Sequence, residues 1–196
     1  MNHLAHVFLA GPDTDLQLGG LLADFWRGAP DPAWREGVRA GVALHRKIDS
    51  YTDGHATVAR LREVFAPPFR RYAGILLDMY FDHALALRWK EYSSEPIEAI
   101  SERALRLVEE NRDWLPSDLL RFASYMRTNG LFAAYARREM IEHALTGMSR
   151  RLTRANPLGD AGGALWKNTE VLDAGFAEFF PQLSAFARAQ RALLGC

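Results

Sequence analysis

The sequence contains a single cysteine, Cys196, at the last of its 196 positions. One cysteine cannot form a disulfide within the chain, and it cannot supply the thiolates of a cysteine-based zinc site. Disulfide frameworks and zinc fingers are therefore excluded. A chain without disulfides is typical of a reducing compartment, so we expect the protein to be cytoplasmic.

The sequence also lacks an excess of either charge and any long hydrophobic run. Lys and Arg total 24, as do Asp and Glu, so the formal net charge is zero. Non-specific binding to nucleic acid then has no overall electrostatic drive, and we expect no nucleic-acid partner. The apolar residues 1–10 are too few to span a bilayer and have no basic leader, so we expect no membrane association.

Strand patterns and glycine-rich catalytic motifs are missing as well. We find no alternation typical of β-strands and no GxxxxGK[ST], GxGxxG or GxSxG motif, which removes the sequence support for P-loop, dinucleotide and serine-hydrolase sites. Apolar residues recur with a helical period instead, and the sequence predicts a single all-α domain over residues 1–196. Helices are expected at 1–10, 15–26, 33–53, 55–65, 69–92, 95–113, 117–128 and 131–146, with a loop at 156–160 and a final helical stretch at 164–194, broken at Pro181.

Histidine is concentrated near the start of the chain, where five of the six histidines lie within the first 83 residues. In the expected helix 33–53, His45, Asp49 and Asp53 are spaced i, i+4 and i+8. Residues at this spacing share one helix face that rotates slowly along the helix. His3 and His6, spaced i and i+3, share a face of the first helix in the same way.

Two carboxylates interrupt the most apolar helix of the chain. Asp78 and Asp82 are one helical turn apart within residues 75–83, and His83 follows directly. Burial of two unpartnered carboxylates costs several kcal/mol, and like charges one turn apart repel each other. A metal ion or a group of arginines would resolve both problems. Asp24, in the apolar residues 21–26, presents the same problem.

Less specific interpretations stand beside the metal hypothesis. A single histidine in an apolar helix is more often a hydrogen-bonded core residue than a ligand. Asp49 and Asp53 could form salt bridges with Arg46 or Lys47. Mixed histidine and aspartate ligation suits Mn²⁺, Fe²⁺ or Zn²⁺, whereas Mg²⁺ depends more on the carboxylates.

Four stretches of the first 90 residues closely resemble acyl carrier protein phosphodiesterases. They are residues 2–6, 20–25, 44–55 and 70–83, and they occur in the order found in that family. The length agrees for the whole chain, whereas the C-terminal half carries few diagnostic residues. The resemblance implies a compact helical fold related to the HD-type metal phosphohydrolases, although adjacent His-Asp is reversed here to Asp82-His83.

The resemblance also implies an activity and a cofactor. Water would cleave the phosphodiester of holo-acyl carrier protein, giving the apo-carrier and 4′-phosphopantetheine, with Mn²⁺ as the associated metal and Mg²⁺ as a substitute. The expected partner is an acidic acyl carrier protein. The alternatives are an HD-like phosphohydrolase acting on a nucleotide or another small phosphate ester, and a non-catalytic helical protein that binds carrier protein or sequesters metal.

The residue patterns and the family resemblance together suggest a role for each candidate residue. The expected catalytic residues are His6, Asp24, His45, Asp49, Asp78 and Asp82. The expected metal ligands are Asp24, His45, Asp78, Asp82 and His83. Ligand orientation or proton transfer is expected of His3, Asp53 and His55. Phosphate or carrier binding is expected of Arg39, Arg46, Lys47, Arg70 and Arg71, with Arg35 as a further docking candidate and Arg137, Arg138, Arg150, Arg151 and Arg154 as a second basic concentration.

Overall fold

The computed structural model describes residues 1–194, so Cys196 lies outside the described residues. These residues form helices and no strand, which confirms the all-α prediction for this part of the chain. The helices are α1 (His3–Leu9), α2 (Thr14–Leu22), η1 (Ala23–Phe25), α3 (Glu36–Gly54), α4 (Ala56–Arg62), η2 (Phe69–Tyr72), α5 (Ala73–Leu87), α6 (Trp89–Tyr92), α7 (Ile97–Glu110), α8 (Ser117–Asn129), α9 (Leu131–Ala134), α10 (Arg138–Arg151), η3 (Leu158–Asp160), α11 (Gly162–Lys167) and α12 (Thr169–Leu193).

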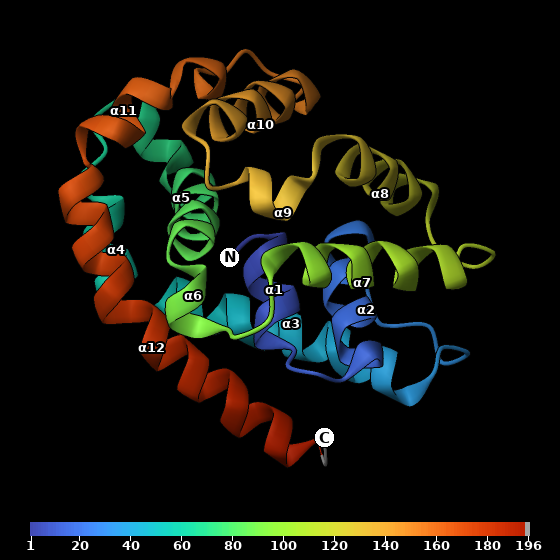
Figure 1. The fold of residues 1–196 in the computed structure, drawn as a ribbon. Coiled ribbons are helices and arrows are strands. Elements are labelled where there is room, and N and C mark those ends of the chain that lie inside the picture. The colour runs from blue at the N-terminus through green and yellow to red at the C-terminus, as the bar shows by residue number, and fades with distance from the viewer. Residues whose placement is uncertain (195–196) are drawn as a thin grey trace.

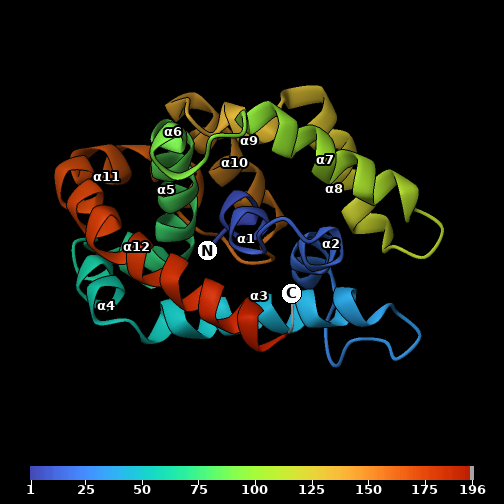
Figure 2. The same ribbon diagram turned by 60° about the horizontal axis from the view of Figure 1, so that its bottom comes forward.

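The short helix α1 lies at the centre of the fold (Figures 1 and 2), where it contacts α2, α5 and α12. Leu4, Val7 and Leu9 are almost completely buried in the common core. The first turn of α1 is held by Asp82 of α5, whose carboxylate accepts the backbone N–H groups of Leu4 and Ala5 at 2.9 and 3.1 Å. A carboxylate at a helix N-terminus satisfies backbone donors that have no partner within the helix.

Helices α2 and α3 pack backbone against backbone. A Cβ atom on Gly19 of α2 would lie 2.2 Å from the Val38 carbonyl oxygen, and one on Gly41 of α3 would lie 2.5 Å from the Leu16 carbonyl oxygen. Only glycine at both positions permits this approach. The close crossing brings the end of α2, which leads into Asp24, against the middle of α3.

The long C-terminal helix corrects one prediction. Helix α12 continues through Pro181 for 25 residues, from Thr169 to Leu193, and curves around the molecule (Figure 1). Proline in a helix interior costs about 3 kcal/mol. Phe176, Phe179, Phe180 and Leu183 are completely buried around the proline, and their packing outweighs that cost.

Other boundaries also differ from the sequence prediction. The expected helix 131–146 is divided into α9 and α10 by residues 135–137, and the expected helix 69–92 is divided into η2, α5 and α6. The expected loop 156–160 contains the turn η3. No helix within residues 1–194 has both the length and the apolar composition needed to cross a bilayer.

Candidate functional site

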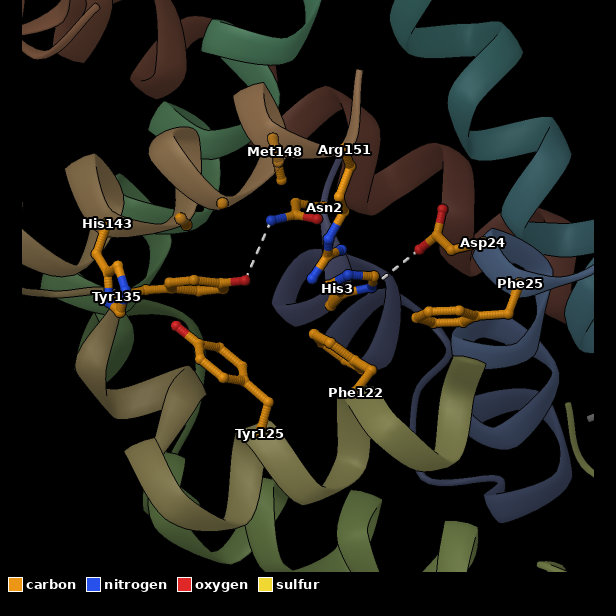
Figure 3. A pocket seen from close by; sticks show the side chains of 12 residues that line it. Asn2, His3, Asp24, Phe25, Phe122, Tyr125, Tyr135, His143, Met148 and Arg151 are labelled. Carbon is orange, nitrogen blue, oxygen red and sulfur yellow. Dashed lines mark hydrogen bonds and ion pairs between the residues drawn. The ribbon is translucent and has the colours of Figure 1, made fainter. Parts of the chain in front are cut away.

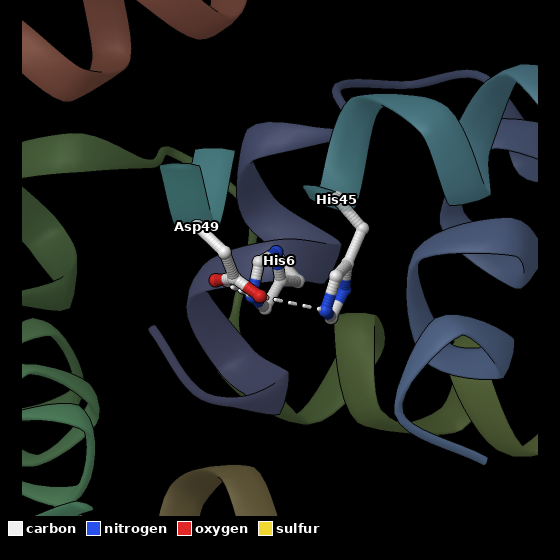
Figure 4. A group of neighbouring side chains, drawn as sticks. All are labelled: His6, His45 and Asp49. Atoms are coloured by element: carbon white, nitrogen blue, oxygen red, sulfur yellow. Dashed lines mark ion pairs between the residues drawn. The ribbon is translucent and has the colours of Figure 1, made fainter. Parts of the chain in front are cut away.

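Three side chains from two helices lie close together between α1 and α3 (Figure 4). His6 comes from α1, and His45 and Asp49 from one face of α3. His6 Nε2 lies 3.1 Å from Asp49 Oδ1, and His45 Nε2 lies 3.1 Å from Asp49 Oδ2. One donor atom from each residue falls within 4.8 Å of the other two, so these three residues could hold a metal ion together.

The orientation of both imidazoles in this group is fixed by their neighbours. His45 Nδ1 donates to the Gly20 carbonyl oxygen at 2.9 Å, which orients the ring and directs Nε2 at Asp49. Both ring nitrogens of His6 are buried without a hydrogen-bond partner among the described residues, although Nε2 is close to Asp49. A buried donor without a partner is costly, and a cation would remove that cost.

The two imidazoles stack with ring centroids 3.6 Å apart and planes 15° apart. Burial disfavours the charged form of His6, and electrostatic repulsion from the stacked His45 ring adds to this effect. Together they lower the pKa of His6 to about 4. His6 is therefore neutral at physiological pH.

Carboxylates line the open side of the group. Asp24 Oδ1 lies 3.5 Å from His45 Nε2, and Asp24 Oδ2 lies 2.9 Å from His3 Nδ1. Burial would raise the pKa of Asp24, but the charge of His3 and a hydrogen bond from it outweigh burial and lower the pKa to about 2. Burial would also raise the pKa of Asp49, but the adjacent imidazoles of His6 and His45 outweigh burial and hold that pKa well below the usual range. Both carboxylates are therefore ionised at neutral pH.

Asp78 is linked to this group by the N-terminal ammonium of the chain. The N-terminal ammonium of Met1 lies 2.9 Å from Asp78 Oδ1 and 3.3 Å from Asp49 Oδ1. Burial alone would lower the pKa of the ammonium, but the two carboxylates raise it to about 10. Burial raises the pKa of Asp78, against the opposing effect of the ammonium. Positive charge thus lies between two carboxylates, as the repulsion between such groups requires.

The structure places Asp82 and His83 away from this group. Asp82 is completely buried, and both its oxygens hold the first turn of α1. Burial raises the pKa of Asp82 to about 7, and the two backbone hydrogen bonds limit that rise. His83 Nδ1 donates to the Tyr135 carbonyl oxygen at 2.7 Å, and the ring packs near Trp166. Neither residue belongs to the group of His6, His45 and Asp49 that could hold a metal ion together.

Asp53 and His55 also lie elsewhere. Asp53 forms an ion pair with Arg62, and the His55 ring accepts the Thr57 backbone N–H at 3.2 Å as the N-cap of α4. Of the three residues spaced i, i+4 and i+8 on α3, the first two, His45 and Asp49, therefore meet as expected. Asp53 is rotated by about 80° around the helix from His45, because eight residues advance a helix by slightly more than two turns.

The basic residues expected to bind phosphate are engaged within the chain. Arg39 and Arg46 donate to carbonyl oxygens of Pro32 and Gly28, and Lys47 donates to the Gln190 side chain. Arg70 pairs with Glu63, and Arg71 stacks over Tyr72. None of the five lines the pocket described next.

A pocket of about 300 Å³ opens beside Asp24 and His3 (Figure 3). Its walls come from Phe122 and Tyr125 of α8, Tyr135, and Met148 and Arg151 of α10. Of these five residues, only Arg151 was expected from the sequence to have a role, as part of a second basic concentration. Apolar and aromatic residues of the C-terminal half carry the same helical pattern whether they line a pocket or a core, so no sequence signal separates them.

Comparison with known proteins agrees with the motifs of the N-terminal half. Residues 1–183 match the family model "Acyl carrier protein phosphodiesterase". Proteins named acyl carrier protein phosphodiesterase from Escherichia coli and Photorhabdus laumondii are 34% identical over 190 residues and 32% identical over 184. These alignments cover 95% and 93% of this chain, and 97% and 93% of the relatives.

A third relative of the same name, from Pectobacterium atrosepticum, is 30% identical over 192 residues, covering 97% of this chain and all of the relative. No solved structure matches the chain. The family match reaches into α12 and includes every residue of the His6, His45 and Asp49 group. This chain belongs to the acyl carrier protein phosphodiesterase family.

Proposed function

We propose that this protein hydrolyses the phosphodiester of holo-acyl carrier protein, releasing apo-carrier and 4′-phosphopantetheine. The observation that carries the proposal is a pair of buried imidazoles and two ionised carboxylates beside an open pocket, in a chain of this family. An enzyme that splits a phosphodiester must place water and an anionic ester at one point. This arrangement supplies ligands on one side of that point and room for substrate on the other.

The proposal includes a divalent cation held by His6, His45 and Asp49, with Asp24 as a fourth donor. The orphaned nitrogens of His6 and the fixed Nε2 of His45 fit such an ion. Mn²⁺ suits two imidazoles and two carboxylates, and Mg²⁺ would depend on the carboxylates alone. When bound, the ion would supply Lewis acidity that polarises the phosphoryl group and promotes the ionisation of water.

The pocket side chains have separate roles in the proposal. His3 lies between Phe25 and Phe122, with Nδ1 against Asp24, so its ring is held in one orientation. We assign His3 the proton that the departing serine oxygen of the carrier needs, given from Nε2. Arg151 has no ion-pair or hydrogen-bond partner within residues 1–194, and its guanidinium in the pocket suits a phosphate oxygen.

The proposal extends to the fold relation, the docking of the carrier and the location of the protein. An all-helical domain with histidine and aspartate donors on α1, η1 and α3 supports a relation to the HD-type phosphohydrolases. We expect the acidic carrier to meet arginines near the pocket, with no nucleic acid or membrane involved. A formal net charge of zero and a chain with one cysteine support this expectation and a cytoplasmic location.

The direct test is incubation of the purified protein with Mn²⁺ and holo-carrier, followed by mass spectrometry of the carrier. We expect the prosthetic arm to be lost, and His45→Gln to abolish this loss. Turnover of a nucleotide with the carrier left intact would support a small-ester phosphohydrolase instead. Binding of carrier without any hydrolysis by the wild-type protein would support a non-catalytic module.

A further inference from the structure

A second hollow extends the pocket beside Asp24 into a groove. This hollow is bordered by Asp118 and Arg121 of α8, and it shares Asp24, Phe122 and Arg151 with the first pocket. The two hollows adjoin at these shared side chains, and together we call them the groove, which reaches from the first turn of α8, past Asp24, to Tyr135.

The two long walls of the groove are helix faces. On α8, Asp118, Arg121, Phe122 and Tyr125 are spaced i, i+3, i+4 and i+7, which is one face of a helix. On α10, the lining residues are His143, Ala144, Gly147, Met148 and Arg151, which also share one face. The floor is the N-terminal end of α1 together with η1 (Figure 3). The two helices thus form the sides of a channel that passes Asp24, the carboxylate next to His45.

The lining alternates apolar surface with polar groups. Phe122 and Met148 present apolar surface. The polar groups are the His143 ring and the Tyr135 hydroxyl, which accepts a hydrogen bond from the Asn2 side-chain amide at 3.2 Å. A slender chain that carries amide groups and a dimethyl carbon would make contacts of both kinds with such walls. A pocket of about 300 Å³ lies at the small end of ligand sites.

We infer that this groove binds the pantetheine arm of the carrier, an inference that rests on the proposed function. The phosphate lies at the end near Asp24 and His3, within reach of the unpartnered Arg151 guanidinium. The amides and methyl groups of the arm lie along Phe122, Tyr125 and Met148. The groove therefore selects carriers that bear the arm over those that do not.

Gly147 provides a test that leaves the core intact. A Cβ on Gly147 would meet no atom within 4 Å, because that side of α10 faces the groove. Leucine in a helix interior is favoured over glycine, so Gly147→Leu is expected to fold and to fill the groove. Gly163→Leu is the matched control, since a Cβ there also meets no atom within 4 Å and Gly163 lies outside the groove.

Two measurements test whether the arm binds in the groove. With EDTA present, binding of holo-carrier and apo-carrier is compared by calorimetry, and with Mn²⁺ present, KM and kcat are measured on holo-carrier. We expect the wild-type protein and Gly163→Leu to bind holo-carrier more tightly than apo-carrier. We expect Gly147→Leu to lose that preference and to raise KM by about tenfold or more.

The outcomes separate this inference from the proposed function. If the wild-type protein cleaves holo-carrier but Gly147→Leu keeps both its preference and its KM, the arm does not lie in the groove and the activity stands. Equal binding of holo-carrier and apo-carrier by the wild-type protein would contradict the inference in the same way. If the wild-type protein cleaves no holo-carrier, the proposed function fails, while a preference for holo-carrier that Gly147→Leu removes would still place the arm in the groove.

Discussion

His45 and His83 have the same local geometry in different surroundings. Each is buried, and each donates from Nδ1 to a backbone carbonyl oxygen, at 2.9 Å to Gly20 and 2.7 Å to Tyr135. Only His45 directs Nε2 at a carboxylate, 3.1 Å away on Asp49. Tautomer and burial therefore do not distinguish a ligand from a core histidine, but the group facing the second nitrogen does.

We predict that His45→Gln lowers Mn²⁺ affinity by at least about 100-fold, because it removes a ligand rather than a supporting contact. His83→Gln is expected to keep the affinity of the wild-type protein within a few-fold. Calorimetric titration of the metal-free proteins with Mn²⁺ measures both values. An equal loss in the two variants would return His83 to the ligand set expected from the sequence.

The depressed pKa of His6 predicts a pH-dependent stability in the metal-free protein. The folded value is about 4 and the ordinary value is 6.5, so the unfolded chain binds more protons between these limits. The free energy of unfolding should therefore fall as pH falls from 6.5 to 4, by about 3 kcal/mol at most. Urea unfolding at pH 7 and pH 4.5 measures this change, and His6→Gln should show a smaller one. An identical change in His6→Gln would contradict the assignment.

At the scale of elements, the crossing of α2 and α3 builds the site. The glycine contact between these helices brings η1 beside the middle of α3, and so places Asp24 Oδ1 3.5 Å from His45 Nε2. The sequence indicated both helices. Their closeness follows from the absence of a Cβ at Gly19 and Gly41, which a residue pattern does not distinguish from glycine used in a turn.

We predict that Gly19→Ala destabilises the protein by about 2–3 kcal/mol, because its Cβ would overlap the Val38 carbonyl oxygen and force the helices apart. Mn²⁺ affinity should fall with it as Asp24 moves from His45. Gly74→Ala is the control, since a Cβ there meets no atom within 4 Å, and it should stabilise α5 by up to about 1 kcal/mol. Chemical denaturation of both variants measures the difference, and equal stabilities would contradict the close crossing.

For the whole molecule, the metal proposal predicts a linkage between binding and stability. A ligand that binds only the folded state stabilises it by about 2.7 kcal/mol at 100 times its Kd. For a chain of this length, Mn²⁺ should raise Tm by about 5–10 °C. Differential scanning fluorimetry with Mn²⁺ and with EDTA measures this shift. His45→Gln should show almost none, and a full shift in that variant would mean that the ion binds elsewhere.

The proposed catalytic centre joins parts of the chain that are far apart in sequence. His6, Asp24 and the pair on α3 come from three segments, and the groove that opens beside them is built from α8 and α10. The absence of strands from residues 1–194, most helix positions and the His45–Asp49 spacing were predictable, because they depend on local periodicity. The division of the expected helix 131–146 was not predictable. Its break lies at Tyr135, whose carbonyl oxygen accepts a hydrogen bond from the distant His83 side chain.

The sequence by itself determined an all-helical chain, its concentration of histidine and aspartate, and the family motifs, because each is a property of neighbouring residues. Only the tertiary structure decided which of these side chains meet. Asp78 and Asp82 look alike in the sequence, yet one contacts the N-terminal ammonium beside Asp49 and the other holds the first turn of α1. The reason is physical: one helical turn leaves a rotation of about 40° between them, and packing of α1 against α5 gives each carboxylate a different partner.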